Sequence, residues 1–99
     1  MNIDELLTKS KSIWKNKSDI TDIVIKMGKV FGDICRYARD ADKDKALHTD
    51  DEIKKELGNM IFSSIRWCDD LGYDAKECVE IAINCQEKYQ PKPNSKLGE

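Results

Sequence analysis

The sequence predicts an all-α domain of four helices, and three observations carry this prediction. Apolar residues recur at the three- and four-residue spacing of a helix over almost all of the 99 residues. No stretch alternates apolar and polar residues with a period of two, and no hairpin turn such as Asn-Gly occurs. The apolar runs are bounded by residues typical of helix ends. We therefore expect a bundle-like single domain over residues 1–90 and a loose C-terminal tail over residues 91–99.

The first two helices are expected over residues 3–16 and from residue 19 to about residue 41. Asp4 and Glu5 suit the positive end of the first helix. The stretch "NKSD" then interrupts the apolar pattern, and Ser18 is predicted to cap the second helix. The apolar stripe of that helix is predicted to consist of Ile20, Ile23, Val24, Met27, Val30, Phe31, Ile34 and Ala38.

The last two helices follow a charged connector in which His48 is expected to be a surface residue. Thr49 and Glu52 have the spacing of a capping box, so a third helix should begin there. It should end at Leu71-Gly72, because glycine suits the left-handed residue just past a helix. Asp74 is predicted to cap a fourth helix that ends before two prolines. The inner face of the third helix is predicted to consist of Ile53, Leu57, Met60, Ile61, Ser64, Ile65 and Cys68.

The composition excludes several partners. The chain has 17 basic and 19 acidic residues and a net charge of −2, which offers no broad cationic surface for a nucleic acid. No apolar run approaches the ~20 residues that span a bilayer, so no membrane partner is expected. The N-terminus does not have the pattern of a secretory signal, so we expect a cytoplasmic protein. The cysteines show no C-x-x-C spacing, and we expect them to be reduced and buried.

Oxygen-bearing side chains from two helices are the strongest chemical signal. Glu56 and Asn59 lie three residues apart and share one helix face, and Asp33 follows Lys29 and Val30 by about one turn. Mg²⁺ binds several oxygen ligands, and acids spaced in this way on two facing helices would supply them. The pattern is only half filled, because an amide and a valine take two of the four positions. Single acids on helices are also commonly solvated caps or members of ion pairs.

Two stretches resemble a known family. "DIVIKMGKVFGDICRYA" and "KKELGNMIFSSIRWCDDLGYDAKECVEIAINCQEKYQP" are similar to the MazG-like all-α nucleoside triphosphate pyrophosphohydrolases, whose relatives include dimeric dUTPases and dCTP pyrophosphatases. The resemblance covers roughly residues 12–91, and its most specific part runs from "ELGN" to "LGYDAKE". It implies an all-α fold that assembles as a dimer or tetramer. It also implies hydrolysis of a nucleoside triphosphate to a monophosphate and pyrophosphate with Mg²⁺.

The residues that the resemblance assigns to metal binding are incomplete. In the family, an E-x-x-E and an E-x-x-D motif hold the metal. Val30 falls on the first acidic position and Asp33 on the second, while Glu56 matches the third and Asn59 replaces the fourth. Asp33, Glu56 and Asn59 would thus be a vestigial metal site, at which Mg²⁺ binds weakly or is absent.

The family's substrate-binding positions are also altered. The family has an aromatic residue one turn after the fourth metal ligand, where this chain has Ser63. Ile81 and Cys85 fall on polar phosphate-facing positions of the last helix, and Lys88-Tyr89 alone keeps the basic-aromatic step. We expect Trp67, Lys88 and Tyr89 to be the residues that contact a substrate, with Trp67 only partly covered.

Three functions from different classes follow. In the first, the chain is a degenerate, non-catalytic relative that acts by binding a protein partner or a nucleotide, as a homo-oligomer. In the second, it is a weak Mg²⁺-dependent pyrophosphohydrolase in which Asp33, Glu56 and Asn59 still hold one metal ion. In the third, it is a plain helical dimerisation module. The loss of phosphate-facing polar groups favours the first of these.

Overall fold

The computed structural model describes residues 1–40 and 49–89, and within these ranges the chain is helical without any strand. The four helices are α1 (Ile3–Ile13), α2 (Ile20–Asp40), α3 (Asp50–Asp70) and α4 (Ala75–Lys88). The predicted all-α class and the number of helices are thus confirmed. The predicted surface position of His48 and the predicted tail lie outside the described residues. Over the same ranges, no helix combines the length and the apolar character that crossing a membrane requires.

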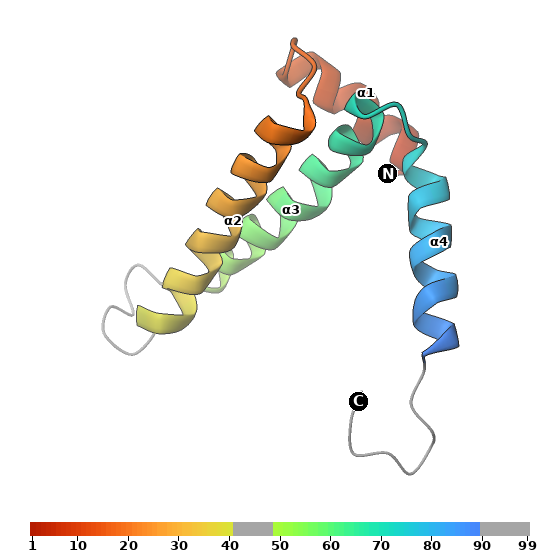
Figure 1. Cartoon of the computed structure of the whole chain (residues 1–99). Helices are drawn as coiled ribbons and strands as arrows, with labels where there is room; N and C mark the ends of the chain where they lie inside the picture. The colour runs from red at the N-terminus through yellow and green to blue at the C-terminus, as the bar shows by residue number, and fades with distance from the viewer. Residues whose placement is uncertain (41–48, 90–99) are drawn as a thin grey trace.

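The helices form an open arch (Figure 1). α2 and α3 lie side by side as one limb, α1 crosses the end of this pair, and α4 leaves the end of α3 as a second limb that diverges from the first. α3 contacts each of the other three helices, so it is the central element on which the chain is assembled. Among residues 1–40 and 49–89, no helix covers the inner side of the arch.

Local capping rules determine where three of the helices begin. The side chain of Asn2 accepts a hydrogen bond from the amide of Glu5 at 2.8 Å and caps α1. Thr49 caps α3 as predicted, since its Oγ1 accepts from the amide of Glu52 at 3.3 Å. Asp74 caps α4, also as predicted. These side chains satisfy amides that have no partner within the first turn of a helix.

The prediction that Ser18 caps α2 is wrong. The amide of Asp22 donates a hydrogen bond to the Oδ1 of Asp19 at 2.9 Å, which makes Asp19 the capping residue. Ser18 is buried instead, and its amide donates to the carboxylate of Asp70 on α3 at 3.1 Å. The local pattern predicted Ser18 as the cap of α2, but Ser18 instead makes a tertiary contact with α3. α1 also ends at Ile13 rather than near residue 16, because Trp14 has an extended backbone.

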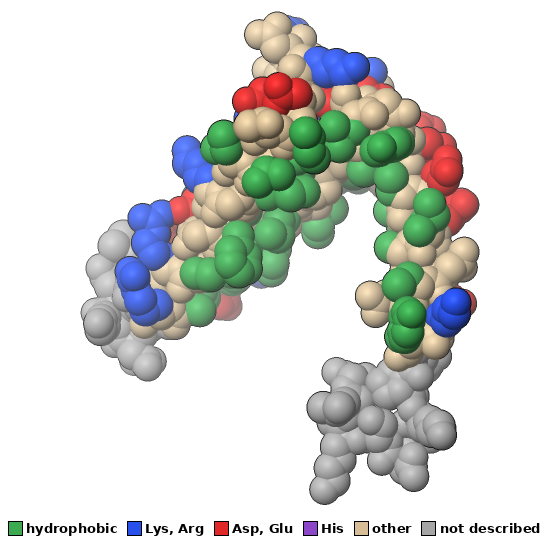
Figure 2. All heavy atoms as spheres, viewed as in Figure 1, with side chains coloured by type: hydrophobic (Ala, Val, Ile, Leu, Met, Phe, Trp, Pro, Cys, Tyr) green, Lys and Arg blue, Asp and Glu red, His purple; other side chains and the backbone are tan. Residues whose placement is uncertain are grey.

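The core of the single chain is small. Its buried hydrophobic residues in the described ranges are Ile23, Ile65, Trp67 and Ala75. Much of the predicted apolar stripes is exposed, including Val24 at 59%, Phe31 at 61% and Ile61 at 65% of their surface. Figure 2 shows hydrophobic side chains gathered along the inner side of the arch. The stripes were predicted to face a core, and in the single chain they face solvent.

The prediction that the cysteines are buried is also wrong for the single chain. Cys35 and Cys85 are exposed, and Cys68 and Cys78 are half-buried. All four are free thiols, as expected for a chain without disulfides. The reason is the same as for the stripes, since helical spacing identifies an apolar face but not the element that covers it.

Candidate functional site

A cavity of about 360 Å³, here called the polar cavity, lies between α2, α3 and the segment that joins α1 to α2. Asp33 from α2 and Glu56 and Asn59 from α3 all line it. The structure therefore brings these three predicted residues to one cavity. The other residues that line the polar cavity are Trp14, Asn16, Ser18, Lys26, Lys29, Val30, Ser63, Arg66, Trp67 and Asp70.

The three residues predicted to contact a substrate, Trp67, Lys88 and Tyr89, do not all lie together. Trp67 lines the polar cavity but is only 7% exposed, so the expectation that it is partly covered is wrong. Its indole forms a wall of the cavity. Lys88 and Tyr89 lie at the end of α4 and do not line the polar cavity of their own chain. The structure of one chain therefore brings Trp67 to the predicted metal-site residues and leaves the Lys88-Tyr89 step apart from them.

Trp14 is the more accessible aromatic residue of the polar cavity. It is 39% exposed, and its ring lies 5.3 Å from that of Phe62 between centroids, with a tilt of 40°. Phe62 thus supports the indole from α3, while part of the ring stays open. An exposed, supported indole of this kind is a surface on which a planar group can stack.

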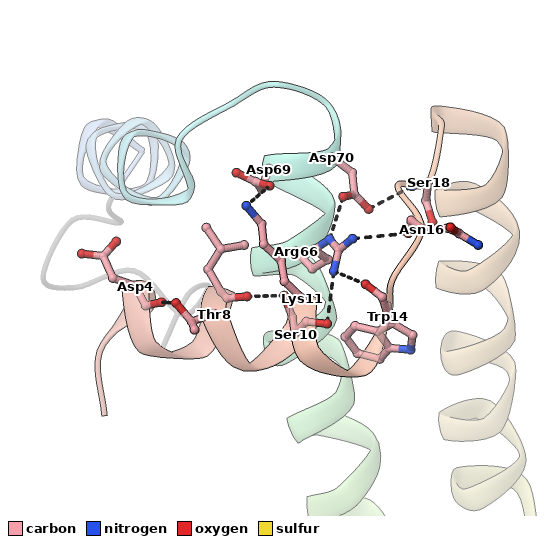
Figure 3. A network of polar contacts seen from close by, with 11 residues as sticks. Asp4, Thr8, Ser10, Lys11, Trp14, Asn16, Ser18, Arg66, Asp69 and Asp70 are labelled. Carbon is pink, nitrogen blue, oxygen red and sulfur yellow. Dashed lines mark hydrogen bonds and ion pairs between the residues drawn. The ribbon is translucent and has the colours of Figure 1, made fainter.

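A buried guanidinium, that of Arg66, contributes to the lining of the polar cavity, and Figure 3 shows its polar contacts. Arg66 is 5% exposed, and its Nε donates to Asp70 at 2.7 Å. Its Nη1 donates to the carbonyl oxygens of Ser10 at 3.1 Å and Trp14 at 2.7 Å, and its Nη2 donates to that of Asn16 at 3.3 Å. Arg66 therefore binds one carbonyl group in the last turn of α1 and two in the segment that follows it. This interaction fixes the segment from α1 to α2 against α3.

Sequence reasoning missed this network. Arg66 stands among polar and apolar residues about one turn before the end of α3, where a helix cation is usually solvated. The one local signal is the i,i+4 spacing of Arg66 and Asp70. The other acceptors are backbone carbonyl groups more than 45 residues away in the chain. No side-chain pattern identifies such acceptors in advance.

The charges around the polar cavity are unevenly paired. Its lining has three cations and three anions, but Arg66 and Asp70 neutralise each other. Asp33 is paired with Arg36, which lies outside the lining. These two pairs leave Lys26 and Lys29 of α2 with Glu56 as the remaining charges of the polar cavity.

The three remaining charges have weak partners. Glu56 has Lys55 at 3.7 Å, although Lys55 lies closer to Glu52 at 2.9 Å. The Lys26 Nζ donates to the neutral hydroxyl of Ser18 at 2.8 Å. Lys29 has no ion-pair partner within the described parts of the chain. Outside the two ion pairs with arginines, the polar cavity therefore has two lysines and one carboxylate, so its unpaired charge is mainly positive.

The side chains of the polar cavity are a poor fit to a divalent cation. Mg²⁺ takes oxygen ligands in octahedral geometry and is attracted by carboxylates that are not already paired. Asp33 is paired with Arg36, Asn59 contributes no charge, and two lysine side chains line the same space. Among residues 1–40 and 49–89, no group of three or more His, Cys, Asp or Glu side chains has an arrangement that suits a metal ion.

Comparisons with models of known protein families, with curated proteins and with solved structures found no match to this chain.

Proposed function

We propose that the chain is a degenerate relative of the MazG-like pyrophosphohydrolases that has lost catalysis and acts by binding, as a homodimer. The observation that carries the proposal is the charge of the polar cavity, where Lys26 and Lys29 face Glu56 and the carboxylate of Asp33 is paired with Arg36. A site of this charge repels the dication that the family's reaction requires. A neutral amide at Asn59 removes a further part of the attraction for metal.

The apolar inner side of the arch supports the binding role. A hollow of about 920 Å³ opens there between α4 and the other limb. We call its lining the concave face, and its larger side chains include Leu6, Met27, Phe31, Ile61, Trp67 and Val79. Soluble monomers rarely leave a contiguous apolar surface of this extent uncovered, because contact with water opposes it. A protein surface is the occupant that its size and apolar chemistry suit.

We propose that a second copy of the chain covers the concave face. Its side chains are open to solvent in the single chain, with Met27 43%, Phe31 61%, Ile61 65% and Val79 47% exposed. A stable interface buries about 800 Å² from each partner and has an apolar centre, and this exposed apolar lining, contributed by all four helices, suits such an interface. A net charge of −2 gives little repulsion between copies.

The catalytic part of the proposal is tested by measuring pyrophosphate release. The purified chain is incubated with each common nucleoside triphosphate and Mg²⁺, and with Mn²⁺ as a second arm. We expect no release above that of a heat-denatured sample. Metal-dependent release that is lost in the Glu56→Ala variant would instead support the weak pyrophosphohydrolase. The observation in favour of that alternative is that Asp33, Glu56 and Asn59 line one cavity.

The binding part of the proposal is tested by sedimentation of the same sample. We expect the mass of a dimer at micromolar concentration. A monomer that keeps its helical circular dichroism would exclude a second copy as the occupant of the concave face. A heterologous protein would then be the partner to seek.

A further inference from the structure

From the charges and aromatic residues of the polar cavity we infer that it binds a small phosphate-bearing molecule with a planar ring, directly through Lys26 and Lys29 and without a divalent metal. This deepens the proposed function, because it names the ligand of a cavity that we propose has lost its metal. The inference rests on three features of the cavity, which are its free cations, its open indole and its neutral polar groups.

The two lysines are placed to share one anion. They lie three residues apart on α2 and line the same cavity, so both ammonium groups can approach a single phosphate. Lys26 has only the Ser18 hydroxyl as a partner, at 2.8 Å, and this neutral bond is easily exchanged for a charged one. The acids of the cavity do not compete equally, because Asp33 and Asp70 are already paired with arginines.

The rest of the lining suits the remainder of such a ligand. Trp14 offers a partly exposed indole supported by Phe62, on which a planar ring can stack. Asn59 and Ser63 lie one turn apart on α3 and provide neutral donors and acceptors. The volume of about 360 Å³ is at the lower end of the range for small-molecule sites. The ligand is therefore small and carries one phosphate group.

The test uses AMP as the probe, with calorimetry in EDTA so that no divalent metal is present. The sequence contains two tryptophans, and both line the polar cavity, so their fluorescence gives an independent signal of binding at this site. We expect AMP to bind. Ribose 5-phosphate should bind more weakly because it lacks the planar base, and adenosine should bind most weakly because it lacks the phosphate. Added salt should weaken AMP binding and leave adenosine unaffected.

Lysine variants connect the signal to the proposed residues. Lys26→Gln and Lys29→Gln should each weaken AMP binding by roughly tenfold, because each removes a charged partner of the phosphate. Lys54→Gln is the matched control, since Lys54 is exposed on α3 and does not line the polar cavity, and it should bind as the unaltered chain does. Circular dichroism verifies that each variant is folded.

Four results would overturn the inference. They are no binding of AMP in EDTA, binding that requires Mg²⁺, adenosine binding as tightly as AMP, and equal losses in Lys54→Gln and Lys29→Gln. The outcome is separate from that of the proposed function. Pyrophosphate release tests catalysis, whereas these titrations test metal-free recognition, and either result can occur without the other.

Discussion

Arg66 joins the last turn of α1 and the start of the α1–α2 connection to α3 through three hydrogen bonds, and a fourth from the same buried guanidinium pairs it with Asp70. Replacing it with methionine would leave the carboxylate of Asp70 buried without its cation. We expect Arg66→Met to lower the free energy of unfolding by about 3–5 kcal/mol, measured by urea denaturation. Arg36→Met removes the exposed pair with Asp33 and should cost less than about 1 kcal/mol.

If Arg66→Met does not fold, the double variant Arg66→Met/Asp70→Leu provides the test. It removes both buried charges together, so it should be more stable than Arg66→Met alone. A double variant as unstable as the single one would show that the lost backbone hydrogen bonds, and not the unpaired Asp70, dominate. Equal stability of Arg66→Met and Arg36→Met would contradict the structural role given to Arg66.

Cys68 provides a prediction of pH dependence at the same scale. Burial, and next the neighbouring Cys78 thiol on α4, raise the pKa of Cys68 from its ordinary 9.0 to about 11. Between these two values the unfolded chain loses the proton and the folded chain keeps it. The free energy of unfolding should therefore fall as the pH rises from 9 to 11, and Cys68→Ala should reduce that fall.

The same raised pKa predicts slow alkylation of Cys68. At pH 8.5 the thiolate is the reacting form, and Cys68 should carry less of it than an ordinary thiol does. Mass spectrometry after a short exposure to iodoacetamide should find less label on Cys68 than on the exposed Cys35. Equal labelling of the two cysteines would contradict the raised pKa.

At the scale of elements, the two glycines of α3 and its exit have opposite roles. Gly72 has φ +83°, a left-handed conformation that turns the chain from α3 into α4. Gly58 lies inside α3, where an added Cβ would meet no atom within 4 Å. We expect Gly72→Ala to lower the free energy of unfolding by about 1 kcal/mol and Gly58→Ala to raise it by up to about 1 kcal/mol. Thermal or urea unfolding measures both variants. Free energies of unfolding that change in the same direction in the two variants would contradict these opposite roles.

The sequence was sufficient for features that depend on neighbouring residues. Thr49, Asp74 and Gly72 were correctly predicted at helix ends, because capping and turn geometry involve only a few positions. Helical spacing also brought Asp33 and Glu56 to one cavity, since each lies on the face where its helix meets the other. Local rules therefore predicted both the elements and part of the candidate site.

Features that depend on distant segments could not be predicted. Ser18 fits a capping pattern, yet its amide donates a hydrogen bond to the carboxylate of Asp70, which lies 52 residues away in the chain. Trp67 was expected to be only partly covered, since it lies beside the apolar stripe of α3, yet it is 7% exposed. Helical spacing does not reveal how closely α1 and α2 pack on α3. The pairing of Asp33 with Arg36, which alters the charge of the cavity, depends on side-chain conformations that spacing alone does not determine.

At the scale of the whole molecule, the open arch predicts that stability depends on protein concentration. If a second copy covers the concave face, dilution favours the separated and less stable chain. We expect the midpoint of thermal unfolding to rise with concentration over a hundredfold range. A midpoint independent of concentration would mean that the single chain is the stable species.

A pair of variants identifies the interface. Phe31→Asp places a charge on the concave face and should convert the dimer into a monomer in sedimentation experiments. Ile25 is equally exposed on α2, at 65%, but does not line the concave face. Ile25→Asp should therefore remain a dimer. Dissociation by Ile25→Asp and not by Phe31→Asp would place the interface on the other side of α2.

Trp67 lines both the polar cavity and the concave face, so a single indole separates the two surfaces. Any displacement of this ring when one surface is occupied alters the shape of the other. Ligand affinity and self-association are then thermodynamically coupled, and the coupling is reciprocal. Because the dimer has two equivalent cavities, saturating AMP shifts the monomer–dimer equilibrium by the square of the factor by which dimerisation changes the affinity of each cavity for AMP. The chain would thereby report the concentration of a small metabolite through its state of assembly.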